Sequence, residues 1–278
     1  MSLKFCILFF ITFSFGFAAG SAVSDLNYVP LDGEFAGRTN INFYRDTTII
    51  ELSGNEFILE TDQRTVRQSF LYGLTPWISG GFTIPFVFNG SSSIDNGQSS
   101  VSNALNSDLG RSIFTLTAQF GPEEQAQSFL SASFQESETD SRGFYSLSYA
   151  LRKKLELSSY FLEFQFSEID EDLIVEKQMR FTINFLMQIQ LKNGFFLRPG
   201  FSLTSETDLI FKDTDEVLEN EFILEPSLSL GQEVSDYHFY WLVGYSASYS
   251  KLLYRDSFGQ ERGENLFNNL EFEFGYRF

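Results

Sequence analysis

Few residues of this chain could carry catalysis. Among 278 residues there is one histidine, His238, and one cysteine, Cys6. Ser246 and Ser248 fall on the same face of a predicted strand as His238. Both lie too far along the strand for the short hydrogen bond that joins a serine nucleophile to its base. No phosphate-binding loop, HExxH motif or GxSxG motif occurs. The pattern therefore predicts that the protein is not an enzyme.

Carboxylates are the abundant ionisable groups. The chain has 37 Asp+Glu against 19 Lys+Arg, which gives a formal net charge of -18. Two acidic segments, 167–176 and 206–220, are typical of solvated loops. Their oxygen ligands could bind divalent cations weakly, but neither has the glycine that a twelve-residue calcium loop needs at its tight turn. We expect no metal site and no cofactor, and the acidity disfavours nucleic acid and anionic solutes approaching these loops.

The first residues predict an export signal. Lys4 precedes an apolar run over 5–17, and small residues follow at 18–22. Residues 1–22 are therefore expected to be a signal peptide with cleavage near 20–22, since the run is too short for a membrane anchor. Cys6 would leave with this peptide. The mature chain would then have no thiol, which excludes disulfides, a cysteine–zinc site and a cysteine nucleophile.

The last segment of the chain alternates strictly between apolar and other residues. The apolar positions are Leu270, Phe272, Phe274, Tyr276 and Phe278, and between them lie Glu271, Glu273, Gly275 and Arg277. Period two places all five apolar side chains on one face of a strand. After residue 22 no run of 18 apolar residues occurs, so a helical membrane protein is excluded.

The same alternation recurs at 114–120, 179–191, 222–231 and 237–249. Strands of about ten residues, apolar on one face and small or polar on the other, are typical of transmembrane β-barrels. Only a closed sheet can cross lipid, because an open edge would leave backbone groups unpaired there. A soluble β-sandwich also alternates, but it seldom tolerates so many rows of phenylalanine. The predicted fold is an all-β, antiparallel, up-and-down transmembrane barrel.

Connection lengths give the expected topology. Short connections near 73–76, 121–127, 152–155, 192–194 and 232–236 alternate with longer, mostly acidic ones near 89–110, 136–142, 167–176, 206–220 and 251–265. Barrels have short periplasmic turns and longer outer loops. We expect about twelve strands. They lie near 40–52, 64–72, 77–88, 111–120, 128–135, 143–151, 156–166, 177–191, 194–205, 221–231, 237–250 and 266–278. Residues 23–39 would be a short periplasmic segment and 40–278 the barrel; at 53–60, a hairpin turn at Gly54 and Asn55 is the alternative to a loop.

The two faces of these strands have different expected roles. Tyr237, Trp241, Tyr276 and Trp77 lie near strand ends, where aromatic rings mark the boundary between lipid and water. Parity directs a set of charged side chains into the lumen: Arg67, Glu163, Arg180, Arg198, Glu225, Glu233, Glu271, Glu273 and Arg277, together with His238. Arg180 is expected opposite Glu163. Such pairs either hold the lumen together or set a field across a solute pathway.

Asp236-Tyr237-His238 resembles the Asp-x-His pair of the omptin proteases. Those enzymes act at the outer rim and use a second acidic pair. Here His238 follows a short turn and is expected at the periplasmic end, whereas Asp170 and Asp172 belong to the opposite rim. With a barrel height of ~25 Å the two pairs cannot meet. We therefore expect a lumen histidine satisfied by a neighbour such as Arg277.

Residues 70–90 carry a second resemblance. A strand, then Tyr72-Gly73-Leu74-Thr75, then a strand ending Ile84-Pro85-Phe86, resembles the transporter-type barrels of the phenol meta-pathway and related outer-membrane families. Gly73 and Pro76 suit a periplasmic turn. The final Tyr276-Arg277-Phe278 also resembles the C-terminal signal that barrel assembly machinery reads, with Tyr276 and Phe278 as the signal residues.

The resemblance implies an outer-membrane channel that passes small solutes, aromatic or hydrophobic ones among them, by passive diffusion. About twelve strands would enclose a lumen narrower than that of sixteen-stranded porins. The alternative is a closed structural or binding barrel without transport. A long-chain fatty-acid transporter would need a longer chain and an N-terminal hatch. Expected partners are outer-membrane lipid and lipopolysaccharide, the barrel assembly machinery and an unidentified small solute, but no nucleic acid.

Overall fold

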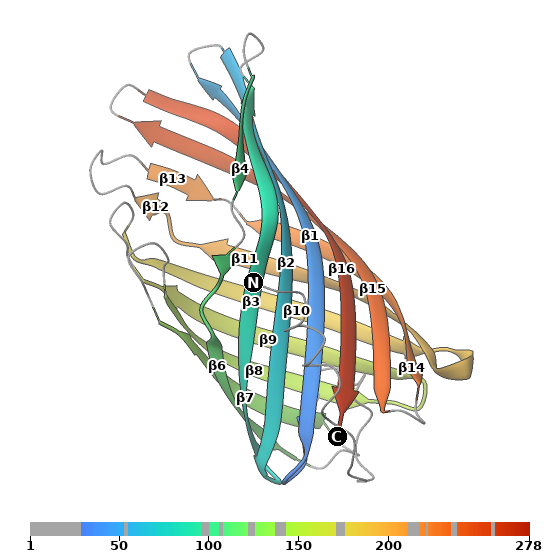
Figure 1. Ribbon diagram of the computed structural model, residues 1–278. Coiled ribbons are helices and arrows are strands. Elements are labelled where there is room, and N and C mark those ends of the chain that lie inside the picture. Colours follow the sequence, from blue (N-terminus) through green and yellow to red (C-terminus); the bar gives the residue numbers. More distant parts are fainter. Residues whose placement is uncertain are drawn as a thin grey trace.

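A computed structural model describes residues 29–52, 55–95, 100–105, 108–121, 126–136, 143–170, 176–210, 217–220, 222–234, 238–256 and 259–278. Twelve strands close into an antiparallel barrel (Figure 1). They are β1 (Phe35–Leu52), β2 (Asn55–Thr75), β3 (Ile78–Asp95), β6 (Ile113–Phe120), β7 (Ala126–Gln135), β8 (Phe144–Lys154), β9 (Ser158–Ile169), β10 (Gln178–Gln190), β11 (Phe195–Glu206), β14 (Ile223–Val234), β15 (Phe239–Asp256) and β16 (Gly259–Arg277). The predicted fold class is confirmed.

The barrel closes between its first and last strands. β1 pairs with β16 from Ala36 opposite Arg277 to Ile50 opposite Gly263, and with β2 along its other edge. At the periplasmic end, the Phe278 N–H donates to the Phe35 carbonyl at 2.8 Å. The first and last described strands are therefore paired with each other, which closes the sheet as a bilayer crossing requires.

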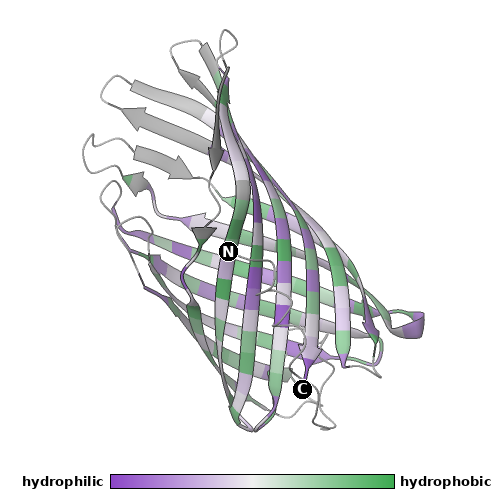
Figure 2. Cartoon of the chain, in the orientation of Figure 1, coloured by the Kyte–Doolittle hydropathy of each residue, from purple (hydrophilic) through white to green (hydrophobic). Residues whose placement is uncertain are grey.

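Apolar and polar residues alternate along the strands as expected (Figure 2). On β15, Tyr245 and Tyr249 point outward and are exposed, whereas Ser246 and Ser248 between them are buried. Phe114 and other outward rings are also exposed, because the outer wall has no protein against it. The outer face is therefore the lipid-facing belt. Among the described residues, no helix has both the length and the apolar character to cross a bilayer.

Two predicted outer loops are wrong. Where 53–60 was expected to be a loop, β2 already begins at Asn55, which pairs with Leu52. Of the alternative turn at Gly54 and Asn55, Asn55 therefore lies in the strand and Gly54 lies outside the described residues. Where 251–265 was expected to be a loop, β15 and β16 continue until Asp256 pairs with Gly259. These strands rise past the other half of the barrel (Figure 1). Apolar and polar residues do not alternate over 251–265, although the backbone ladder continues there.

Two further expected loops contain short strands. In 89–110, β4 (Ser100–Leu105) and β5 (Asp108–Leu109) fold back onto β3, and in 206–220, β12 (Leu209–Ile210) and β13 (Val217–Asn220) pair with each other, β13 also with β15. A 3-10 turn, η1 (Lys192–Gly194), forms one periplasmic connection. β1 begins at Phe35 rather than at residue 40. The predicted signal peptide, residues 1–22, lies outside the described residues.

Candidate functional site

The middle of the lumen holds a cavity of about 400 Å³. Inward-facing positions of β1, β9, β10, β11, β14, β15 and β16 line it, because every second residue of a strand points to the same side. Its charged and amide lining residues are Arg38, Glu163, Asn184, Arg198, Glu225, Asn269, Glu271 and Glu273. Ser202, Ser227, Ser229 and Ser246 fill the positions between them. The cavity is thus a polar chamber inside a lipid-facing shell.

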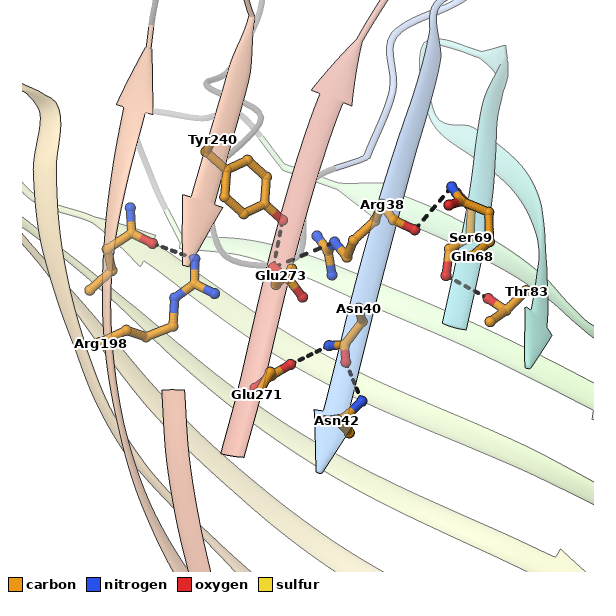
Figure 3. A network of polar contacts seen from close by, with 11 residues as sticks. Arg38, Asn40, Asn42, Gln68, Ser69, Thr83, Arg198, Tyr240, Glu271 and Glu273 are labelled. Carbon is orange, nitrogen blue, oxygen red and sulfur yellow. Dashed lines mark hydrogen bonds and ion pairs between the residues drawn. The ribbon is translucent and has the colours of Figure 1, made fainter. Parts of the chain in front are cut away.

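A network of polar side chains connects β1, β15 and β16 on the lumen side of the barrel wall (Figure 3). Tyr240 donates its hydroxyl to Oε1 of Glu273 at 2.6 Å, and Nε of Arg38 lies 3.8 Å from the same oxygen. Asn40, the next inward-facing residue of β1 after Arg38, donates a hydrogen bond to Glu271. Because Glu273 is almost fully buried, the arginine and the phenol replace the water that its charge would otherwise need. The network therefore fastens the closing strands while leaving Glu271 along the cavity.

Pairs of hydroxyl groups line the lumen along β2, β3, β6 and β7. Thr115 and Thr117 on β6 hydrogen-bond Ser133 and Ser131 on β7, both at 3.0 Å. Ser69 on β2 and Thr83 on β3 form a similar pair at 2.8 Å. These strands therefore present paired hydroxyl groups to the lumen, with Arg67 of β2 as a charged residue among them.

Two apolar clusters also face the lumen, and neither was predicted from the sequence. Towards the periplasmic end, Phe129, Ala150 and Phe161 are buried together and pack with Leu186 and with Val29, which precedes the barrel. Their parity is the inward one of each strand, since Phe129 pairs with Ala150. The inner face was expected to carry small or polar side chains, and these large apolar side chains differ from that expectation. Each lies between polar neighbours of the same face, where the sequence pattern alone would not single it out.

The second apolar cluster contains Ala36, Phe196, Tyr240 and Leu242. Glycines on neighbouring strands make room for its rings. A Cβ at Gly275 would lie 1.9 Å from Tyr240, and one at Gly231 would lie 2.4 Å from Phe196. The rings therefore lie flat against the wall, an arrangement in which an aromatic covers a glycine of the adjacent strand.

Residues 29–34 enter the lumen at the periplasmic end. Gly33 N–H donates to the Gly73 carbonyl and Gly73 N–H donates to the Glu34 carbonyl, both at 3.0 Å. The Glu34 carboxylate pairs with Nε of Arg277 at 3.1 Å, and both side chains are buried. Pro30 is buried as well. This short segment narrows the periplasmic mouth of the barrel.

A second cavity, of about 680 Å³, lies on the outer side of the first. Arg67 and Arg180 line it, together with Glu225 and Glu271. The expected pair of Arg180 with Glu163 is wrong. Nε of Arg180 lies 2.5 Å from Glu206, and Glu163 instead accepts a hydrogen bond from Asn184 at 2.9 Å.

The error lies in the register of one hairpin. β9 continues to Ile169, which pairs with Gln178, so the turn is centred later in the chain than expected. Arg180 is consequently opposite Ser167 rather than Glu163. On its other side β10 places Arg180 opposite Glu206 of β11. Sequence parity gave the face of these residues, but the pairing depends on where the turn falls.

His238 lies beside Arg277, the neighbour expected for it. Nη2 of Arg277 is 2.9 Å from Nδ1 of His238, and the histidine backbone has a φ of 48° in the left-handed region. Glu233, another predicted lumen residue, lies opposite Tyr240 of β15 in the sheet register. Asp236, Tyr237 and Asp172 lie outside the described residues. Within the described part of the chain, no group of three or more His, Cys, Asp or Glu side chains is placed to hold a metal ion.

Comparison with known proteins gives similarity in fold without similarity in sequence. No family model matches the chain. No curated protein matches it either. Among solved structures, the COG4313 outer membrane channel from Pseudomonas putida F1 superposes with a TM-score of 0.62 at 14% identity, over 92% of this chain and 98% of that one. A Pseudomonas aeruginosa FadL homologue gives 0.49 at 7% identity, over 88% and 90%. The CymD monoaromatic hydrocarbon channel gives 0.44 at 9%, over 89% of each chain. The chain therefore has the fold of outer-membrane β-barrels.

Proposed function

We propose that this protein is an outer-membrane channel through which small solutes pass by passive diffusion. The observation that carries the proposal is the relation between the two lumen cavities. Glu225, Asn269 and Glu271 line both of them. Two polar chambers that share lining residues are the arrangement that a solute path from the outer mouth to the middle of the barrel needs. A barrel whose only task is structural has no need of such a path.

The lining favours solutes that have both a polar and an apolar part. Phe161, Leu186 and Leu242 face the central cavity beside its carboxylates and arginines. Oδ1 of Asn269 is buried without a hydrogen-bond partner among the described residues, so it can accept a bond from a solute. A volume of about 400 Å³ is at the small end of ligand cavities. A single-ring compound with hydroxyl groups fits this combination of size and polarity.

The periplasmic segment favours a second candidate, a closed barrel that binds a ligand without transport. Val29 and Pro30 fill space beside the apolar lumen cluster, and Glu34 is held by Arg277. A closed barrel with this segment in place would bind solute from the outside and release it to the same side. Conductance distinguishes the two candidates, because only an open path carries ions across a bilayer.

Planar-bilayer recording of the purified, refolded protein tests the proposal. We expect discrete conductance steps, and uptake of small hydroxylated aromatics in liposome swelling. Asn269→Trp should reduce the step size, because residue 269 lines both cavities. Asn268→Trp is the matched control, since Asn268 faces outward and accepts a hydrogen bond from Tyr245. Absence of steps from folded wild-type protein would reject the channel and favour the closed binding barrel.

A further inference from the structure

We propose that the outer wall of the barrel binds the phosphate of an anionic glycolipid of the outer leaflet, with Arg64 as its main ligand. Arg64 lies on β2, opposite Phe43 of β1 and Phe88 of β3. Both phenylalanines face outward and are exposed. The guanidinium carbon of Arg64 lies 5.9 Å from the centre of the Phe43 ring. This contact holds the cation against the lipid-facing surface.

Arg64 marks the outer limit of the apolar belt. Towards the periplasm, the next outward residue on β2 is Val66, and apolar and aromatic residues dominate the outer face below it. Away from the periplasm, the outward positions become polar, with Asp62 on β2, Arg45 on β1 and Ser91 on β3. Lipid headgroups lie at the level where the outer face of a barrel changes in this way. The guanidinium is therefore at headgroup depth.

Arg64 differs from the other arginine at this level in having no carboxylate partner. Arg45 binds Asp62 through two hydrogen bonds, at 2.9 and 3.2 Å. Among the described residues, none forms an ion pair with Arg64. The protein is strongly acidic, with a formal net charge of -18, so an unneutralised cation on its membrane-facing wall stands out. A guanidinium at the edge of lipid is stabilised by an anion that the membrane supplies.

A hollow beside Arg64 gives the anion a place. It has a volume of about 460 Å³ and is lined by the outward residues Phe43, Asp62, Arg64 and Ser91, by Gly90, and by Tyr44 and Gln63 from the lumen side of the same strands. The register of β2 and β3 shifts between Asp62 and Arg64, and this irregularity lies at the hollow. A phosphate there could accept two parallel hydrogen bonds from the guanidinium of Arg64. The acyl chains of the bound glycolipid would then lie along Phe43 and Phe88, on the apolar belt.

The test compares two arginines of the same strand with opposite parity. Arg64 faces the membrane, and Arg67, three residues on, lines the lumen. Arg64→Gln and Arg67→Gln remove the same charge from the two faces. Binding of bis-phosphorylated lipid A to refolded protein in mild detergent is measured by native mass spectrometry, with heat-modifiable migration showing that each variant is folded.

Arg64→Gln should weaken binding of the phosphorylated lipid by about tenfold, the loss of roughly 1.4 kcal/mol. Arg64→Lys should fall between wild type and Arg64→Gln, because an ammonium keeps the charge but not the planar fork. Arg67→Gln should bind as wild type does. Fully dephosphorylated lipid A should bind weakly and equally to all four proteins. Equal binding of the phosphorylated lipid by wild type and Arg64→Gln, or binding of the dephosphorylated lipid as tight as that of the phosphorylated one, would overturn the proposal.

Discussion

Phe185 and Asn184 are adjacent in the chain but face lipid and lumen respectively. The ring of Phe185 packs beside Phe201 at 5.5 Å and Tyr160 at 6.5 Å in an outward aromatic row. The amide of Asn184 binds Glu163 across the lumen wall at 2.9 Å. Substitutions at these two neighbours therefore compare the lipid-facing and the lumen-facing environments within one strand.

We predict that Phe185→Arg lowers the free energy of unfolding by ~2–4 kcal/mol, because a lipid-facing charge must lose its water or reach for the interface. Asn184→Arg should cost much less, since lumen water and the Glu163 carboxylate can meet the new cation. Urea titrations of refolding into lipid vesicles would measure both. Equal losses for the two variants would contradict the assignment of the faces.

The closing pair of strands depends on contacts at its periplasmic end. Phe278 follows β16, exchanges two backbone hydrogen bonds with Phe35 of β1, and packs its ring beside those of Phe35 and Tyr276. The remainder of the β1–β16 ladder is long and continuous. Losing the last residue therefore removes a small part of a large interface.

Deletion of Phe278 should leave the purified protein able to refold in detergent, because burying one such ring contributes only ~1.5–3 kcal/mol. In cells we expect a strong fall in outer-membrane levels, since the C-terminal aromatic resembles the signal that assembly machinery reads. Phe274→Ala is the control: it removes an outward ring that stacks on Phe239 but keeps the terminus. Heat-modifiable, protease-resistant barrel would be measured for both variants in cells and in detergent. Equal losses in cells would show that Phe278 acts only as another lipid-facing residue.

For the molecule as a whole, the charges along the lumen decide which ions pass. Four carboxylates line the central cavity, from Glu163, Glu225, Glu271 and Glu273, against the two guanidinium groups of Arg38 and Arg198. Arg38 forms an ion pair with Glu273. Glu163 and Glu271 instead accept hydrogen bonds from neutral amides, those of Asn184 and Asn40. The cavity therefore carries an excess of negative charge in a confined, partly desolvated space.

Conducting protein should accordingly prefer cations in a potassium chloride gradient. Glu225→Gln should move the reversal potential towards that of an unselective pore, because it removes a carboxylate that both cavities share. Glu264→Gln makes the same chemical change on the outward face of β16 and should leave the reversal potential nearly unchanged. A reversal potential showing anion preference in the wild type would contradict this charge assignment.

By itself the sequence determined where the strands of the membrane belt lie and which face carries the residues that follow the alternation. Alternation is a local property, because successive side chains of a strand point to opposite sides. Polar groups are unfavourable in lipid, so the outward side chains are apolar. Leu270, Phe272 and Phe274 could thus be assigned outward, and Glu271 and Glu273 inward, without any knowledge of the neighbouring strands. Arg38 was not among the predicted lumen residues, because the first strand was expected to begin after it.

Only the tertiary structure decided which inward residues meet. The partner of Arg180 is Glu206 and not Glu163, because a strand register depends on where a turn falls and on the strand along the other edge. The burial of Phe129 and Phe161 inside the lumen, and the entry of Val29 beside them, depend on space left between strands far apart in the chain. Past the apolar belt, β1, β2, β15 and β16 continue through backbone pairing, joined by side-chain contacts such as that of Arg45 with Asp62. No periodic apolar pattern marks them there, so the sequence alone did not predict their length.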